Sequence, residues 1–146
     1  MRRSLTTNPK YITLESHRSW NMSQIRSKDT KPEIFFRKLL WSNGFRYRLH
    51  SNVLPGKPDI VLKKFKTSLF INGCFWHQHP GCKRSTMPKS NIKYWRQKLN
   101  RNVERQKLVL AKLEKLGWRV VTVWECQVKK IDANLFIKHL IMGGVE

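Results

Sequence analysis

The sequence predicts an α/β domain in which a mixed β-sheet is flanked by helices and one loop carries a structural zinc ion. Three observations indicate this class. Periodic segments follow one another in the order helix, strand, hairpin, long helix, strand, helix. The 146 residues suit one domain with a proper core. Cysteine and histidine are concentrated in residues 72–82, and these side chains are the usual ligands of zinc.

The first helix is expected to follow Thr30. A threonine N-cap, an early proline at Pro32 and Glu33 three positions after the cap are typical of a capping box, and Gly44 suits the end of the helix. The buried stripe of this helix is predicted to contain Ile34, Phe35, Leu39 and Leu40.

The strands are expected in the middle of the chain and near its end. Residues 45–49 alternate apolar side chains with arginine, which is typical of a half-buried strand. Residues 58–62 and 68–71 predict two short strands joined as a hairpin, and Pro55-Gly56 predicts a turn before them. The largely apolar run 119–124 suits a central strand.

The long helix is expected to open at Ser90 and to close at Gly117. Gln106 falls on its inward row, where a polar side chain should have a hydrogen-bond partner. Asp132 to Met142 predicts a last amphipathic helix. The apolar members of the inward row of the long helix are Ile92, Trp95, Leu99, Val103, Leu110 and Leu113.

Charge points to nucleic acid. Thirty Lys and Arg against nine Asp and Glu give a net charge of +21, which attracts phosphate polyanions and makes binding sensitive to salt. Residues 1–28 are expected to be a basic N-terminal arm that orders on its partner, and residues 29–146 a single folded domain. No segment is apolar enough to span a membrane and no signal peptide opens the chain, so a cytoplasmic, nucleoid-associated protein is expected.

The zinc ligands are expected among the cysteines and the histidines of the loop. The odd number of cysteines argues against a disulfide framework and for reduced thiols. Cys74, His79 and Cys82 lie in one loop, and Cys126 at the end of a strand can complete a tetrahedron. Spacing alone also allows His77 in place of His79, and ordinary buried cysteines are the alternative interpretation.

A site for a hard divalent cation must draw on few carboxylates. Asp59 stands out because it begins a strand directly after Pro-Gly-Lys-Pro, although turn chemistry beside proline also explains it. Metal-assisted phosphodiester cleavage needs such a carboxylate for Mg²⁺ and a group that moves a proton. His77 is the nearest titratable neighbour, although a lone histidine is more often structural. The capping box already explains Glu33.

Together these residues make the chain resemble the very short patch repair (Vsr) DNA mismatch endonucleases from about Arg18 to about Lys129. The resemblance rests on the Gly-Cys-Phe-Trp-His run and the Trp-Glu-Cys run above all, which are very specific. The other shared stretches are Arg18-Ser19-x-Asn21-Met22-x-x-Ile25, Asp29-Thr30-x-x-Glu33, Leu54-Pro55-Gly56-x-Pro58-Asp59 and Asn102-Val103-Glu104-Arg105.

The resemblance implies a restriction-endonuclease-like fold and a nick in one strand of duplex DNA, 5′ to the mispaired thymine of a T:G mismatch. It also implies that Asp59 and the backbone carbonyl of Ile71 bind the catalytic Mg²⁺, that His77 is the acid/base group, and that Glu33 holds a metal-bound water. It assigns zinc to Cys74, His79, Cys82 and Cys126. It assigns DNA contacts to Phe75, Trp76 and Trp95 as wedges from one groove, to Met22 and Ile25 from the other, and to Asn102.

Two positions depart from the family pattern. Gln106 replaces an aspartate that orients the catalytic histidine, and glutamine cannot stabilise an imidazolium by charge. Asn72 replaces a common histidine. Two other functions therefore stay open: a restriction-type double-strand endonuclease and a non-catalytic DNA-binding module. The expected partner is mismatched duplex DNA bound by a monomer, mismatch-repair proteins are candidate further partners, and no membrane partner is expected.

Overall fold

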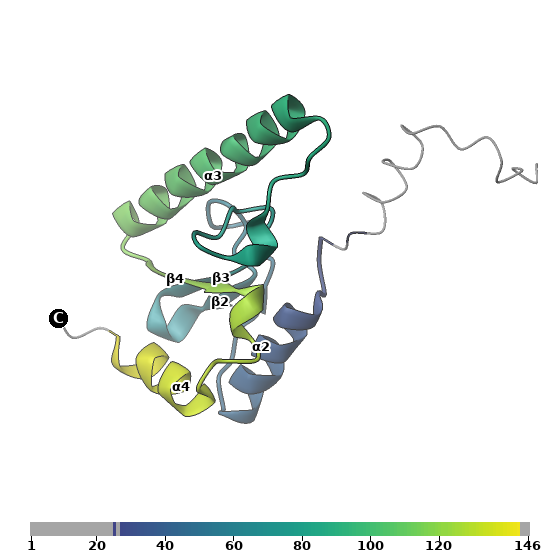
Figure 1. Cartoon of the computed structure of the whole chain (residues 1–146). Coiled ribbons are helices and arrows are strands. Elements are labelled where there is room, and N and C mark those ends of the chain that lie inside the picture. Colours follow the sequence, from purple (N-terminus) through teal and green to yellow (C-terminus); the bar gives the residue numbers. More distant parts are fainter. Residues whose placement is uncertain (1–24, 26, 144–146) are drawn as a thin grey trace, which may run out of the picture. The chain divides into compact units, whose positions relative to one another are not determined.

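The computed structural model describes Ile25 and residues 27–143, and its centre is a four-stranded mixed sheet (Figure 1). The strand order is β1-β2-β3-β4, with the first two pairings antiparallel and the pairing of β3 with β4 parallel. A parallel pairing requires a long crossover, and here the crossover carries the loop of cysteines and histidines. The strands are β1 (Arg48–Leu49), β2 (Ile60–Leu62), β3 (Thr67–Asn72) and β4 (Arg119–Trp124).

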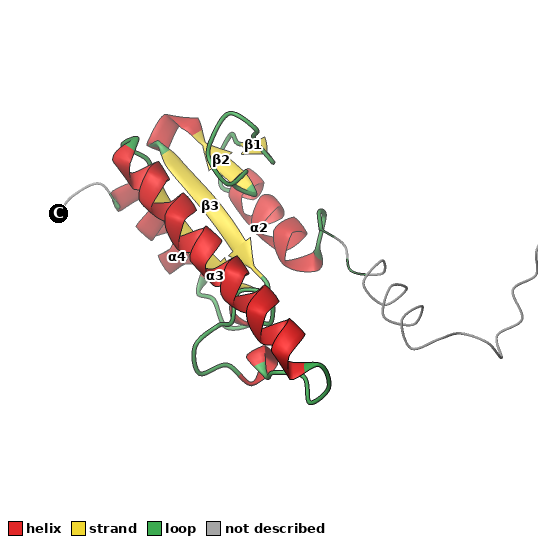
Figure 2. Ribbon diagram, turned by 90° about the horizontal axis from the view of Figure 1, so that it is seen from above, coloured by secondary structure: helices red, strands yellow, loops and turns green. Residues whose placement is uncertain are grey.

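Helices cover both faces of this sheet, as the sequence predicted. The helices are α2 (Lys31–Ser42), α3 (Ile92–Lys115) and α4 (Ala133–Met142). Figures 1 and 2 show α2 and α4 on one face and α3 running across the other. The mixed sheet flanked by helices is therefore confirmed.

The main core lies between the sheet and the pair α2 and α4. Phe36 of α2 and Phe136 of α4 meet there with ring centroids 5.3 Å apart. Two assignments to buried stripes were wrong, because Ile34 is 38% exposed and Ile92 is 45% exposed. The buried members of the cluster are Phe36, Leu40, Phe45, Ile60, Leu62, Leu69, Val123, Phe136 and Leu140.

The predicted hairpin is confirmed. β2 and β3 pair antiparallel with Ile60 opposite Leu69, and a 3₁₀ turn at Lys63–Phe65 joins them. The predicted strand over residues 45–49 was wrong in extent, because only Arg48–Leu49 pairs with β2. Phe45 precedes the pairing and is buried against Phe65 at 5.3 Å between ring centroids. Packing of this ring, rather than strand pairing, explains its apolar character.

β4 was predicted as a central strand, and that was wrong: it lies at the edge of the sheet formed by the described residues. Val121 and Val123 face the core beneath α2 and α4, while α3 packs on the other face of β4. Its apolar composition therefore reflects two covered faces and not two neighbouring strands.

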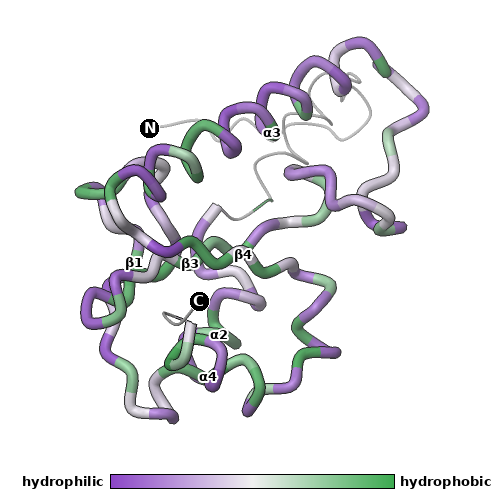
Figure 3. The backbone as a smooth tube through the Cα atoms, turned by 90° about the vertical axis from the view of Figure 1, so that its left-hand side faces the viewer, coloured by the Kyte–Doolittle hydropathy of each residue, from purple (hydrophilic) through white to green (hydrophobic). Residues whose placement is uncertain are grey.

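The helix ends follow local chemistry. α3 begins at Ile92, two residues after the predicted Ser90, with Asn91 at the N-cap position. Gly117, with φ +77°, follows its end as predicted. Asp132 accepts a hydrogen bond from the Leu135 N–H at 3.0 Å and caps α4, which begins at Ala133. Figure 3 shows how polar most of α3 is. Among the described residues, no helix is long and apolar enough to span a bilayer.

Candidate active site and metal centre

The crossover leaves β3 at Asn72 and folds at once into a compact turn. His77 N–H donates to Gly73 O at 3.2 Å, and His79 N–H donates to Cys74 O at 2.9 Å. The carboxylate of Glu125, after β4, accepts the Cys74 N–H at 3.1 Å. The turn is thereby fixed to the segment that follows β4, although 51 residues separate Cys74 from Glu125.

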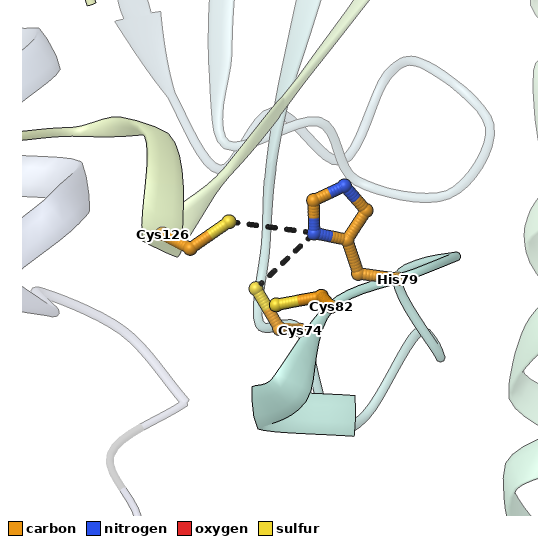
Figure 4. A group of neighbouring side chains, drawn as sticks. All are labelled: Cys74, His79, Cys82 and Cys126. Carbon is orange, nitrogen blue, oxygen red and sulfur yellow. Dashed lines mark hydrogen bonds between the residues drawn. The ribbon is translucent and has the colours of Figure 1, made fainter. Parts of the chain in front are cut away.

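The turn brings the four predicted zinc ligands together. One ligand atom from each of Cys74, His79, Cys82 and Cys126 lies within 4.8 Å of the others. Figure 4 shows the three thiols around the imidazole of His79. His79 Nδ1 lies 3.6 Å from Cys74 Sγ and 3.4 Å from Cys126 Sγ. The spacing left His77 and His79 open, and His79 is the one in the cluster.

These distances fit tetrahedral zinc. With Zn–S near 2.3 Å and Zn–N near 2.0 Å, a sulfur and a nitrogen ligand of one tetrahedron should lie about 3.5 Å apart. The two measured Sγ to Nδ1 distances bracket that value. Three thiols and one imidazole also form a donor set that closed structural zinc sites use.

Trp124 and Glu125 also contact the turn that carries the cluster, and the sequence predicted no role for them. The Trp124 ring stacks on the His79 ring at 4.1 Å between centroids with an interplanar angle of 7°. Glu125 holds the turn through the Cys74 N–H. The Trp-Glu-Cys run therefore contributes a stacking surface, a hydrogen-bond acceptor and a thiol.

Asp59 lies just before β2, against the end of β3. Its Oδ2 accepts the Ile71 N–H at 2.8 Å. Burial raises the pKa of Asp59 from 3.8 to about 6; the Ile71 N–H opposes this rise and the charge of Glu33 adds to it. The N–H and C=O of one strand residue point to the same edge, so the Ile71 carbonyl also faces the Asp59 side. Oxygen donors of this kind suit a hard cation such as Mg²⁺.

Asn72 and Gln106 join β3 to α3 as a reciprocal amide pair. Each side-chain NH₂ donates to the other side-chain carbonyl at 3.0 Å. Gln106 therefore has the hydrogen-bond partner that its place on the inward row required. The exchange engages both amide groups of the pair.

His77 is in the turn and lies beside Gln106 of α3. Its Nδ1 is buried and has no hydrogen-bond partner within the described part of the chain. Burial lowers the pKa of His77; nearby Gln106 opposes this in part, while Arg105 adds to it. Burial therefore favours the neutral form of the imidazole.

Glu33 is buried, with 4% of its surface exposed, and it faces the Asp59 end of the sheet. Arg37, one helical turn later in α2, donates to Glu33 Oε2 at 3.0 Å. The same Arg37 nitrogen lies 3.1 Å from His50 Nε2. Glu33 thus has an ion-pair partner in the protein in addition to any role at a helix start.

The predicted wedge residues form one aromatic cluster. Ring centroids of Phe75 and Trp76 lie 5.1 Å apart, and those of Phe75 and Trp95 lie 5.5 Å apart. Asn102 donates to Trp76 O at 3.4 Å. The Lys98 ammonium lies 5.6 Å from the Trp76 ring centroid, so a cation borders the cluster. Ile25 is 49% exposed, and Met22 lies outside the described residues.

A series of short contacts links the two predicted catalytic residues. Asp59 bonds to Ile71, its neighbour Asn72 bonds to Gln106, and Gln106 lies beside His77. Within the described residues Asp59 and His77 share no direct hydrogen bond. The sequence reasoning missed Arg37 and His50. The four-residue spacing from Glu33 to Arg37 on a helix was the available signal, while nothing local pointed to His50.

Comparisons with known proteins identify relatives of this chain. The family described as DNA mismatch endonuclease Vsr matches residues 12–84. The chain is 49% identical over 118 residues to the type II nicking enzyme V.NmeAIP of Neisseria meningitidis serogroup A, covering 81% of this chain and 84% of that protein. It is 38% identical over 112 residues to the DNA mismatch endonuclease Vsr of Escherichia coli K12, covering 77% of this chain and 71% of that protein.

A solved structure supports the fold. The catalytic domain of the homing endonuclease I-Bth0305I superposes with a TM-score of 0.53 at 20% identity, over 81% of this chain and 100% of that domain. The predicted restriction-endonuclease-like class of fold is thereby confirmed. At this identity the likeness concerns the arrangement of sheet and helices alone.

Proposed function

Because the chain belongs to the Vsr family of DNA mismatch endonucleases, we propose that it nicks one strand of duplex DNA 5′ to the mispaired thymine of a T:G mismatch. One observation carries the proposal. Strand β3 leads from the Asp59 contact at Ile71 directly into the turn that carries His77 and the aromatic cluster. The Ile71 contact of Asp59, His77 and the candidate wedge residues Phe75 and Trp76 therefore belong to one continuous segment.

Asp59 and the Ile71 carbonyl would hold Mg²⁺. The ion would supply Lewis-acid stabilisation of the charge that develops on the scissile phosphate. Asp59 must be ionised for this, and its pKa of about 6 leaves it ionised at neutral pH. The four-ligand cluster of Cys74, His79, Cys82 and Cys126 would hold a structural zinc that fixes the turn.

His77 is the proposed acid/base group. Its lowered pKa favours the neutral ring, which can accept a proton from the attacking nucleophile. Gln106, held by Asn72, borders the ring and limits its movement. Glutamine orients without adding a charge, so an imidazolium gains less support than an aspartate would give it. Glu33 is proposed to hold a water at the cation, as the family resemblance implies.

The aromatic cluster supports selection of mismatches. Wedging apolar groups between base steps costs a few kcal/mol of stacking, and a mispaired step yields more easily. Phe75, Trp76 and Trp95 are proposed to enter from one groove, with Asn102 beside them. Met22 and Ile25 are proposed to enter from the other.

Strand-resolved nicking of T:G and matched duplexes, with and without Mg²⁺, tests the proposal. We expect a nick in the thymine strand of the T:G duplex only, and only with Mg²⁺. Asp59→Ala should abolish the nick and leave mismatch binding largely intact. Cleavage of both strands of a matched duplex would instead indicate a restriction-type endonuclease. Mismatch binding that never yields a nick would indicate a non-catalytic DNA-binding module.

The proposed partner is duplex DNA bound by one copy of the chain, which would place the protein with the chromosome in the cytoplasm. A net charge of +21 supports phosphate contacts as the main source of affinity. Light scattering of the complex with a short T:G duplex should give the mass of one chain and one duplex. Mismatch-repair proteins remain candidate further partners.

A further inference from the structure

Arg37 lies between the carboxylate of Glu33 and the ring of His50. Its guanidinium nitrogen is 3.0 Å from Glu33 Oε2 and 3.1 Å from His50 Nε2. The side chains of Arg37 and Glu33 are only 15% and 5% exposed. The charge of Glu33 is therefore largely compensated by Arg37 inside the protein.

The ring of His50 contacts both Arg37 and Glu33. A guanidinium has donors and no acceptor, so in the contact with Arg37 the Nε2 of His50 accepts. The same Nε2 lies 3.7 Å from Glu33 Oε2. The His50 backbone N–H donates to Asp59 O at 3.2 Å, and its φ of +44° is strained for a residue with a side chain. Backbone and ring of His50 thus connect Asp59 to Arg37.

The carboxylates of Glu33 and Asp59 interact electrostatically. Glu33 raises the pKa of Asp59, while His50 and Arg37 lower it. A divalent cation at Asp59 would gain from a second free carboxylate in this neighbourhood. Arg37 already uses the one that Glu33 supplies.

We propose that Arg37, oriented by His50, is a positioning residue that keeps Glu33 paired and so makes the cation site at Asp59 a site with one carboxylate. The inference rests on the proposed function, because it assumes that Asp59 binds the cation. Its consequence is weak cation binding by the free protein. A phosphate of the DNA then supplies the missing negative charge, so cation and substrate bind together.

Manganese titration of the zinc-loaded full chain without DNA, followed by the electron paramagnetic resonance of free Mn²⁺, tests this. A nearby positive charge shifts the pKa of a carboxylate by about one unit or more, which is a tenfold change in its affinity for a proton. Arg37→Met removes such a charge, so this variant should bind Mn²⁺ roughly tenfold more tightly than the wild type. Arg37→Lys keeps the charge and should stay near the wild-type affinity. The double variant Glu33→Gln with Arg37→Met removes both charges and should also return to it.

Circular dichroism checks that each variant is folded. Two variants of His50 test the inference independently of a substitution at Arg37. His50→Leu removes the acceptor that orients Arg37, together with the 3.7 Å contact to Glu33, and should tighten Mn²⁺ binding to a smaller degree, whereas His50→Gln supplies an acceptor and should not. Unchanged affinity in both Arg37→Met and His50→Leu overturns the inference. If Asp59→Asn leaves the Mn²⁺ affinity of the Arg37→Met protein unchanged, the cation is not at Asp59 and the proposed metal site fails instead.

Discussion

In the amide pair of Asn72 and Gln106, each side chain uses a donor and an acceptor on the other. Both amides are engaged at 3.0 Å, and Asn72 is only 4% exposed. An aspartate in place of Gln106 would lack the donor that Asn72 Oδ1 now receives. A buried acceptor without a donor costs about 1–3 kcal/mol.

We therefore expect strong coupling in a double-mutant cycle of Asn72→Leu and Gln106→Leu. Each single variant leaves one buried amide unpaired, while the double variant removes both, so the coupling should be about 1–2 kcal/mol. Urea denaturation measures it. The control cycle pairs Asn72→Leu with Glu104→Ala, whose exposed side chain should give additive effects. An additive result for the first pair would contradict the exchange of hydrogen bonds.

Asp59 should reduce the stability of the protein at neutral pH when no divalent cation is present. Folding raises its pKa from 3.8 to about 6, so the protonated form stabilises the fold below pH 3.8 and this contribution is lost as pH rises through 6. Asp59→Asn keeps an acceptor for the Ile71 N–H without the charge. Its free energy of unfolding should exceed that of the wild type by about 1–3 kcal/mol at pH 7.5.

Thermal unfolding in EDTA-free buffer without Mg²⁺ measures this difference at pH 4 and pH 7.5. The gain should shrink to less than about 1 kcal/mol at pH 4, where the folded wild-type carboxyl is neutral. Glu104→Gln on the surface of α3 is the matched control and should show no such dependence. Equal stability of Asp59→Asn and wild type at pH 7.5 would show that burial costs the ionised carboxylate little.

Side-chain chemistry in the sequence predicted the four residues of the cluster. Cys74, His79 and Cys82 lie within one loop, and Cys126 is the remaining cysteine of the chain. Arg37 and His50 escaped prediction because their contact joins a helix to the end of a strand. Such a contact depends on how elements pack, and the local sequence does not encode that packing visibly.

Among the elements, the cluster of Cys74, His79, Cys82 and Cys126 joins the turn after β3 to the segment after β4. Cys126→Ser should remove one ligand and release the turn while leaving the β2 and β3 hairpin paired. We expect zinc content to fall from roughly one ion per chain and stability to fall with it, because binding of metal is coupled to folding. Metal analysis and amide hydrogen exchange of residues 73–86 measure both effects. Thr86→Ala, in the same loop but exposed and outside the ligand set, is the control and should keep its zinc.

Periodicity predicted the long helix, the hairpin and the last helix, because each shows one face to a core. Periodicity did not predict the order of the strands in the sheet. β4 has the composition of a central strand, yet its two apolar faces pack on helices and it pairs only with β3 in the described sheet. Ile34 and Ile92 illustrate the same limit, because an apolar side chain near a helix start can stay exposed where no neighbour covers it.

On the scale of the whole molecule, the net positive charge and the aromatic cluster should contribute separately to DNA binding. Phosphate contacts are the same in any duplex, so affinities for T:G and matched DNA should fall in parallel with salt, by roughly 10³-fold or more between 50 and 200 mM if about six phosphates are neutralised. Fluorescence anisotropy measures the two slopes. Trp76→Ala should lower the T:G affinity without changing its slope. Different slopes for the two duplexes would mean that mismatch recognition itself uses phosphate charge.

The parallel pairing of β3 with β4 also affects the chain during its synthesis. The ribosome makes the N-terminal part first, and Cys126 is among the last fifth of the 146 residues. Asp59 and His77 are therefore made long before the strand and thiol that fix their surroundings. A prematurely terminated product that ends before Trp124 would lack this closure. An unfinished chain therefore lacks the contacts through which Trp124, Glu125 and Cys126 hold the turn.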